Sequence, residues 1–231
     1  TESVTRETNG LGNNSADAKK QYVDAQIDVS PLTAVNQVGE PHTITATVQQ
    51  DDGLPAGPPG DAANAFGPAP DGTCVVFTLP VNTAGATFTT PDDGNSCGGT
   101  ASNLDDCQTT GGTCSITIIN ATTGAVDIHA ATTFSIGTES VTRETNGLGN
   151  NSADASKSYA AARISIGPDD TNGIGESHTF TVTVEADSGS GFDGVDVATV
   201  DVDLTGDADS VGDNCVDGTG DAGEATGQCT V

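Results

Sequence analysis

The sequence has no tryptophan and no methionine, and only 3% of its 231 residues are aromatic. It has six Lys and Arg against 33 Asp and Glu, which gives a formal net charge of −27. A chain with so little positive charge repels nucleic acids and anionic membranes, so we expect no nucleic-acid partner. Long hydrophobic runs are also missing, and we expect no direct insertion into a membrane.

Patterns of helical period are missing too, whereas short segments rich in Thr, Val, Ile and Ala recur between Gly, Asp and Pro. In HTITATV (residues 42–48) and HTFTVTV (residues 178–184), apolar residues alternate with threonine. This period of two is typical of a strand with one buried face and one wet face. Short strands at this spacing predict an all-β protein built from antiparallel sandwiches.

One segment, TESVTRETNGLGNNSADA, occurs twice, at residues 1–18 and at residues 138–155. Weaker similarity continues beyond both copies, so the sequence contains an internal repeat. This repeat predicts two domains. We expect an extended segment and linker over residues 1–18, a first domain over residues 19–147, and a linker with a second domain over residues 148–231. The matched positions beyond the identical segment are Lys20 and Lys157, Tyr22 and Tyr159, Pro31 and Pro168, Gly39 and Gly175, Glu40 and Glu176, and His42 and His178.

The segment NQVGEPHTITATVQQDDG (residues 36–53), followed by VVF (residues 75–77), resembles bacterial immunoglobulin-like domains of the invasin/intimin type. Those domains occur in tandem on cell-surface proteins and carry a Gly-x-x-His-Thr strand, an Asp-Gly turn and a v-x-F strand. Residues 175–184 fit the same pattern in the second copy. The resemblance implies two tandem immunoglobulin-like sandwiches with a structural or adhesive role and no catalytic residues.

Six cysteines without a CxxC pattern indicate disulfides, and therefore an extracellular or cell-surface location. The second copy contains only two cysteines, so its one internal bridge is Cys215–Cys229. Matching the two copies assigns Cys97–Cys114 as the equivalent bridge of the first copy. By subtraction, Cys74–Cys107 is then an additional bridge.

The second copy ends soon after Cys229, and we expect it to lack its closing strands in this chain. The first residues of the chain repeat the end of the closing run of the first copy but follow no domain of their own. Together these features predict head-to-tail association by strand addition, with copies of the same chain as partners. A continuous tandem array from which this chain is one segment explains the same pattern equally well. The predicted inter-subunit strand comprises Thr1, Glu2, Ser3, Val4, Thr5, Arg6, Glu7 and Thr8.

Acidic residues are concentrated near the end of the chain, around DADSVGDNC. Oxygen-rich loops with glycines at their turns can bind calcium, which is the one candidate cofactor. A solvated acidic loop without a bound ion is the alternative. The candidate ligands are Asp203, Asp207, Asp209 and Asp213.

Three Asn-x-Ser/Thr sequons make this a candidate glycoprotein. The lysines lie in the expected linkers, where no crosslink to an asparagine of a neighbouring strand is expected. The candidate glycosylation sites are Asn13, Asn120 and Asn150.

These features predict a structural subunit or repeat segment of an extracellular filament or cell-surface fibre. No nucleophile elbow or other catalytic motif is present, so we expect no enzymatic activity. The alternative is an adhesin-type module that recognises a partner surface or a glycan. That function calls for a concentrated exposed aromatic or apolar patch, and the chain has only two Tyr and six Phe.

Overall fold

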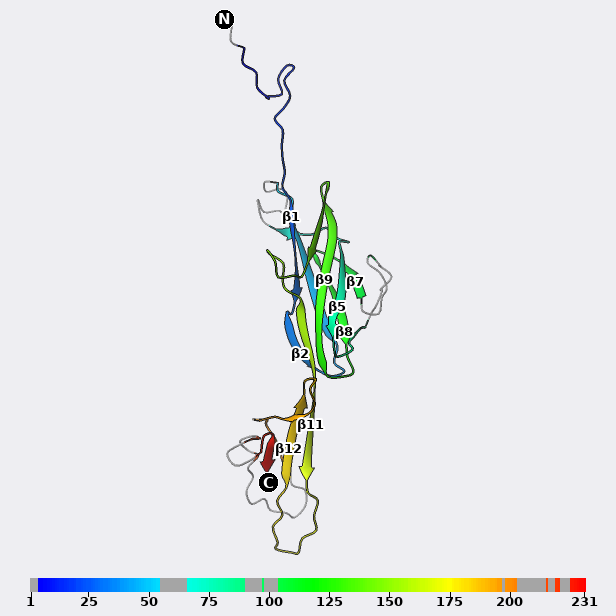
Figure 1. Cartoon of the computed structure of the whole chain (residues 1–231), viewed down its shortest axis with the longest axis vertical. Helices are drawn as coiled ribbons and strands as arrows, with labels where there is room; N and C mark the ends of the chain where they lie inside the picture. The colour runs from blue at the N-terminus through cyan, green and yellow to red at the C-terminus, as the bar shows by residue number, and fades with distance from the viewer. Residues whose placement is uncertain are drawn as a thin grey trace.

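The structure is a computed structural model that describes residues 4–54, 66–89, 97, 104–196, 198–202, 215, 219–220 and 225–231. It is elongated, with two units arranged end to end and the N-terminal segment extending away from the far end of the first unit (Figure 1). The regular elements of the described residues are all β-strands, so the predicted all-β class is confirmed. Within these residues, no helix is long and apolar enough to cross a membrane.

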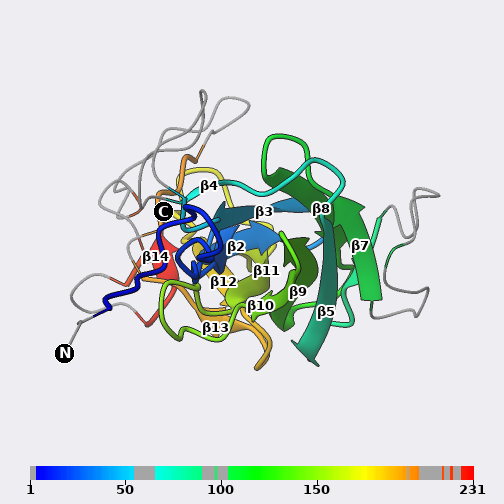
Figure 2. The ribbon, with the colours of Figure 1, turned by 90° about the horizontal axis from the view of Figure 1, so that it is seen from above.

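The first unit consists of two sheets that face each other. Its strands are β1 (Asp24–Ser30), β2 (Thr33–Gln37), β3 (His42–Asp51), β4 (Gly67–Pro68), β5 (Cys74–Asn82), β6 (Thr87–Phe88), β7 (Leu104–Gln108), β8 (Thr113–Ile119), β9 (Gly124–Ile136), β10 (Glu139–Glu144) and the first half of β11 (Ala155–Gly167). One sheet has the order β1-β3-β8-β6, with β4 paired to β3. The other has the order β11-β9-β5-β7, with β2 paired to β11 and β10 paired to β9. Seen along the long axis, β3 and β8 lie on one side of this unit and β9 and β10 on the other (Figure 2).

The core of the first unit follows from the alternation along its strands. In β3, Ile44, Ala46 and Val48 are fully buried, whereas the threonines between them face outward. The outward hydroxyls pair across the sheet, for example Thr45 with Ser115 at 2.8 Å. The predicted burial of alternate residues in HTITATV is therefore confirmed for this strand.

The second unit is smaller and shares a strand with the first. The second half of β11 pairs with β12 (Thr181–Asp187), which also pairs with β13 (Asp193–Gly194) and β14 (Gln228–Thr230). Residues 155–160, which the sequence analysis places in a linker, instead pair with β9 and β2 of the first unit. A single continuous strand thus belongs to both units.

Strand register shows how the two units correspond. Ala46 lies opposite Cys114 in the β3–β8 pair, and Val182 lies opposite Cys229 in the β12–β14 pair. Because Ala46 and Val182 are matched positions of the repeat, β14 corresponds to the start of β8. Among the described residues of the second unit, the buried hydrophobic cluster comprises Val182, Cys215 and Cys229, and no strand corresponds to β9.

The disulfides correct two of the three predicted pairings. The expected Cys215–Cys229 bridge is present, but the first unit contains Cys74–Cys97 and Cys107–Cys114 in place of Cys97–Cys114 and Cys74–Cys107. The register explains the error, because Cys107 lies opposite Val75 and points into the core, whereas the adjacent Cys74 points to the other face of the sheet. Cys74 and Cys107 therefore cannot meet.

The matched bridge of the first unit is Cys107–Cys114, which joins β7 in one sheet to β8 in the other. Its second cysteine, Cys114, corresponds to Cys229 by register. The sequence comparison assigned Cys97 to this bridge because NSC (residues 95–97) resembles DNC (residues 213–215), but the structure pairs Cys114 with Cys107. Cys74–Cys97 is the additional bridge.

The same substitution at two matched positions should lower stability at one position and hardly change it at the other. Ile27 in β1 is fully buried, whereas its counterpart Ile164 in β11 is 64% exposed. Ile27→Ala should lower the free energy of unfolding of the first unit by about 2–5 kcal/mol, because it leaves a cavity. Ile164→Ala should change it by less than about 0.5 kcal/mol.

The measurement is denaturant unfolding followed by the fluorescence of Tyr159, in a Tyr22→Phe background. Equal destabilisation by the two alanine variants would contradict the burial difference between the units.

Candidate functional site

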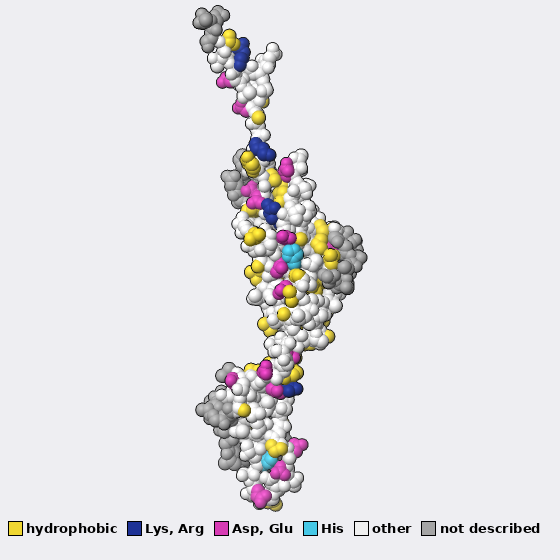
Figure 3. Space-filling view, in the orientation of Figure 1, with side chains coloured by type: hydrophobic (Ala, Val, Ile, Leu, Met, Phe, Trp, Pro, Cys, Tyr) yellow, Lys and Arg dark blue, Asp and Glu magenta, His cyan; other side chains and the backbone are white. Residues whose placement is uncertain are grey.

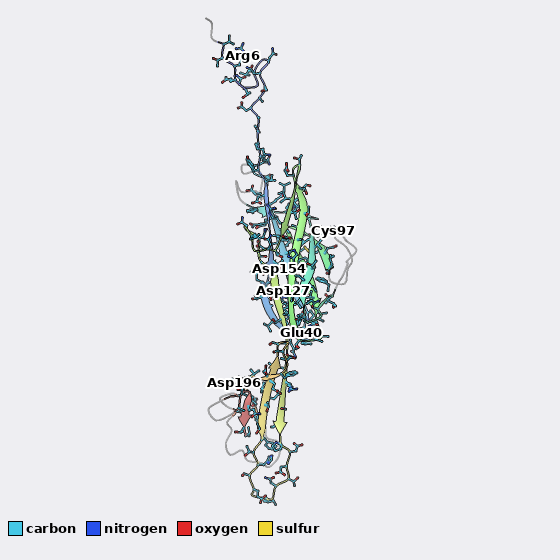
Figure 4. The ribbon with its side chains drawn as sticks, viewed as in Figure 1. Arg6, Glu40, Cys97, Asp127, Asp154 and Asp196 are labelled. Atoms are coloured by element: carbon cyan, nitrogen blue, oxygen red, sulfur yellow. A yellow bond between two sulfur atoms is a disulfide. The ribbon has the colours of Figure 1, made fainter. Side chains whose placement is uncertain are left out.

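The repeated segment occupies two different environments in one chain. We call residues 138–159 the closing segment and the matched residues 1–22 the free segment. The closing segment lies against the first unit, whereas residues 4–22 of the free segment extend away from it. Figure 4 shows the contrast, with Asp154 against the body of the first unit and Arg6 far out on the extension.

Both segments nevertheless form the same loop. Gly147 N donates to Ser152 O, and Gly10 N donates to Ser15 O, each at 2.9 Å. Both glycines lie in the left-handed region, with φ of 68° and 69°, which residues with a side chain rarely adopt. The local sequence therefore forms this loop without help from the first unit. Further shared hydrogen bonds include Asn14 N to Leu11 O and Asn151 N to Leu148 O, Leu11 N to Asn9 Oδ1 and Leu148 N to Asn146 Oδ1, and Thr8 Oγ1 to Asp17 Oδ1 and Thr145 Oγ1 to Asp154 Oδ1.

A polar cluster holds the closing segment on β9. Asp154 Oδ1 accepts from Thr145 Oγ1 at 2.5 Å and contacts His129 Nδ1 at 2.8 Å. Thr145 is almost completely buried, and its backbone N donates to Ala130 O of β9 at 2.9 Å. A nucleophilic triad would need the hydroxyl at His129 Nε2, yet that nitrogen lies 3.7 Å from Glu144 Oε2. The cluster therefore acts as a clamp on the closing segment.

The closing segment also covers the free edge of β1. Ile27 N donates to Asn151 Oδ1 at 3.1 Å, Ser152 N donates to Ile27 O at 3.1 Å, and Val29 N donates to Ser152 Oγ at 3.0 Å. A backbone group left unpaired at a buried edge costs free energy, and these three bonds satisfy the edge of β1. Asn151 and Ser152 thus extend the sheet that β1 begins.

At its other end, the closing segment is held by an arginine. Arg143 Nε donates to Ala25 O at 2.6 Å, and its Nη2 contacts the Asp24 carboxylate. In the free segment, the matched Arg6 donates only to the carbonyl of its neighbour Thr5, at 3.0 Å, among the contacts of the described residues. The difference between the two arginines is the presence of β1 beside one of them.

Lys157 and Tyr159 end the closing segment inside the core. Lys157 is 1% exposed and donates to Asn36 Oδ1 on β2, with its ammonium 5.1 Å from the centre of the Tyr159 ring. Burial lowers the pKa of Lys157 to about 8 and raises the pKa of Tyr159 to about 12. The expectation that the lysines lie outside strands is therefore wrong for Lys157, because β11 starts two residues before it.

Among the described residues, no segment covers the matching edge of β11 in the second unit. Ile164 and Ile166 of β11 are 64% and 60% exposed, whereas their counterparts Ile27 and Val29 are 0% and 3% exposed. Beside these isoleucines lies an open groove of about 270 Å³. Its apolar lining comprises Ile164, Ile166, Val182, Val200 and Val202.

The asparagine that receives the buried lysine has a counterpart in the second unit as well. Asn36 Nδ2 donates to Pro41 O at 3.2 Å, and the matched Asn172 Nδ2 donates to Ser177 O at 2.9 Å. The turn that follows each asparagine is also closed alike, by Glu40 N to Gln37 O in one unit and Glu176 N to Gly173 O in the other. The second unit thus presents the edge and the asparagine that the first unit uses to hold its closing segment.

The predicted inter-subunit strand is only partly described. Thr1, Glu2 and Ser3 lie outside the described residues, and Val4 to Thr8 are exposed. The counterparts of Val4 to Thr8 run along β10 and pair with β9, a strand with no counterpart in the described second unit. The residues whose counterparts bond to Ile27 and Val29 of β1 and pair with β2 lie later in the free segment, at positions 14–22. Arg6 corresponds to Arg143, which contacts the start of β1.

The other predicted sites have different outcomes. Asp203, Asp207, Asp209 and Asp213, the candidate calcium ligands, lie outside the described residues. Elsewhere in the part of the chain that the structure describes, no group of three or more His, Cys, Asp and Glu is placed to hold a metal ion.

Two of the three sequons are accessible. Asn13 and Asn150 are exposed in the matched loops. Asn120 is only 4% exposed, and its Nδ2 donates to Thr122 O, so in the folded unit this nitrogen is not accessible to a glycan. The expectation for Asn120 is corrected on this ground.

Acidic side chains are scattered over both units on the face shown in Figure 3, and basic ones are few. The charge of −27 must be screened before two copies can approach closely.

The chain was compared with known proteins at the level of families and of single sequences. No protein-family model matches the chain, and no curated protein matches it significantly.

The buried lysine predicts an unusual dependence of stability on pH. Because burial lowers the pKa of Lys157 from 10.5 to about 8, the unfolded chain binds more protons than the folded chain between these values. The free energy of unfolding should therefore rise from about pH 8 upward. Tyr159, whose pKa is raised from 10.0, reverses this trend above pH 10.

Melting temperatures measured between pH 7.5 and 9.5 test this expectation. Lys157→Met should remove the rise, whereas Lys20→Met, at the exposed counterpart, should retain it. A rise of the same size in both variants would assign it to other groups.

Proposed function

We propose that this protein is a structural segment of an extracellular filament or cell-surface fibre, built from immunoglobulin-like units in series. The observation that carries the proposal is the continuity of β11 through both units. Ala160 pairs with Gln37 of the first unit, and the next residue, Ala161, pairs with Asp187 of the second. No unpaired residue separates the units, so the joint has no flexible linker.

Side-chain and loop contacts support a stiff joint. Thr123, in the loop before β9, donates to Asp187 Oδ2 at 2.9 Å. Asp187 Oδ1 also accepts from Gly189 N at 2.7 Å and from Gly191 N at 2.9 Å. These bonds to the backbone, with that from Thr123, lower the pKa of the Asp187 carboxyl. A hydrogen bond thus crosses the joint beside the continuous strand.

The strand order supports immunoglobulin-like units. In the first unit, β1, β3, β8 and β6 take the places of strands A, B, E and D, and β11, β9 and β5 take those of G, F and C. The three disulfides fit an oxidising, extracellular location. Both features suit a module that acts as a spacer between other domains or that bears mechanical load.

An adhesin-type module would need an apolar patch aimed at a foreign partner. The exposed isoleucines of the second unit form such a patch, but their counterparts in the first unit are covered by the chain's own closing segment. Because the matched surface of the first unit is covered by a segment of the same chain, assembly is favoured over recognition of a different molecule.

Insertion of three glycines between Ala160 and Ala161 should uncouple the two units. We expect the distribution of interatomic distances from small-angle X-ray scattering to broaden, because the joint then becomes a flexible linker. The same insertion after Ile174, in an exposed turn, should leave the distribution unchanged. If the distance distribution of the native chain is already as broad as that of the variant with glycines at the joint, the proposed stiff segment is contradicted.

A further inference from the structure

We propose that the free segment of one copy docks on the second unit of another copy. Residues 14–22 would take, on β11 and Asn172, the position that residues 151–159 take on β1 and Asn36. This inference rests on the proposed function, because it names the contact that joins one segment to the next. The partner is therefore a second copy of this chain.

Backbone pairing sets the register of this contact. Asn14 and Ser15 are identical to Asn151 and Ser152, which pair with Ile27 and Val29. At the matched edge, Ile164 N should donate to Asn14 Oδ1, Ser15 N to Ile164 O, and Ile166 N to Ser15 Oγ. Addition of a strand at an open edge is a general mode of protein association.

Burial of apolar surface supplies the driving force. Tyr22 is 79% exposed in the free segment, whereas its counterpart Tyr159 is fully buried in the core of the first unit. Ile164 and Ile166 are exposed on the receiving side, next to the apolar groove. Docking would cover apolar surface of all three side chains and so remove that surface from water.

One polar contact adds specificity. Lys157 donates to Asn36 Oδ1, and Lys20 is the counterpart of this lysine in the free segment. Asn172 uses its Nδ2 toward Ser177 O as Asn36 does toward Pro41 O. With Nδ2 engaged in this way, Asn172 Oδ1 is the atom left to accept from Lys20.

The direction of the chain makes the partner a different molecule. The free segment leaves the first unit at the end opposite the second unit (Figure 1). The two units lie end to end between the free segment and the edge that it fits. Docking within residues 1–231 of one copy is therefore excluded by distance, and each contact adds one copy to a head-to-tail series.

The free segment is also prepared for docking. Its loop already has backbone hydrogen bonds of the closing segment, from Gly10 N to Ser15 O and from Asn14 N to Leu11 O. The loop therefore loses little conformational freedom on docking, and this lowers the entropic cost of association.

A labelled peptide of residues 9–23 tests the inference against the full-length protein in 0.15 M salt, which screens the acidic surfaces. We expect saturable binding by fluorescence anisotropy, and slower amide hydrogen exchange at Ile164 and Ile166. Ser15→Pro in the peptide, which removes the N–H donor, should weaken binding at least about tenfold. Asp17→Asn should change it less than about twofold, because the counterpart Asp154 contacts β9 through His129, and the described second unit has no such strand.

Matched variants of the full-length protein locate the site. Ile166→Asp should weaken binding at least about tenfold, whereas Val81→Asp, at an exposed apolar position of β5 in the first unit, should leave it nearly unchanged. Absence of saturable binding, insensitivity to Ile166→Asp, or slowed exchange in β9 instead of β11 would each overturn the docking. If scattering shows a stiff chain while the peptide does not bind, the proposed fibre segment stands and only this contact is wrong.

Discussion

The structure depends on one strand that is hydrogen-bonded in two units. The first half of β11 pairs with β9 and β2, and its second half pairs with β12. A backbone that is hydrogen-bonded to partner strands on both sides of the joint resists bending there, so the end of one unit sets the direction of the next. The elongated shape and the position of the end of the closing segment both follow from the pairing of β11 with strands of both units.

The repeated segment separates local structure from tertiary structure within a single molecule. Its loop is the same in both copies, because glycines and Asn side chains form it by local hydrogen bonds. Burial is not the same, since Tyr159 is enclosed by the first unit whereas Tyr22 faces solvent. The local sequence thus specifies the conformation of the loop, whereas burial of the tyrosine depends on the strands that pack against it.

Lys157 illustrates what burial does to a side chain that is ordinary in sequence. Nothing around it in SKSYA distinguishes it from a linker lysine, and its counterpart Lys20 is exposed. Between the sheets it loses its water, donates to Asn36 and lies over Tyr159. The pKa values of Lys157 and Tyr159 move in opposite directions because one is a cationic acid and the other a neutral one, and burial disfavours the charged form of each.

The sequence by itself determined the β class, the alternation in HTITATV and the position of the repeat, because these depend on local periodicity and identity. It also determined Cys215–Cys229, since the second copy offers no other pair. Only the tertiary structure decided the bridges of the first unit, because facing direction depends on strand register and Cys74 and Cys107 point to opposite faces. It alone placed residues 155–160 in the first unit, since pairing between β11 and β9 is a long-range contact that no local pattern encodes.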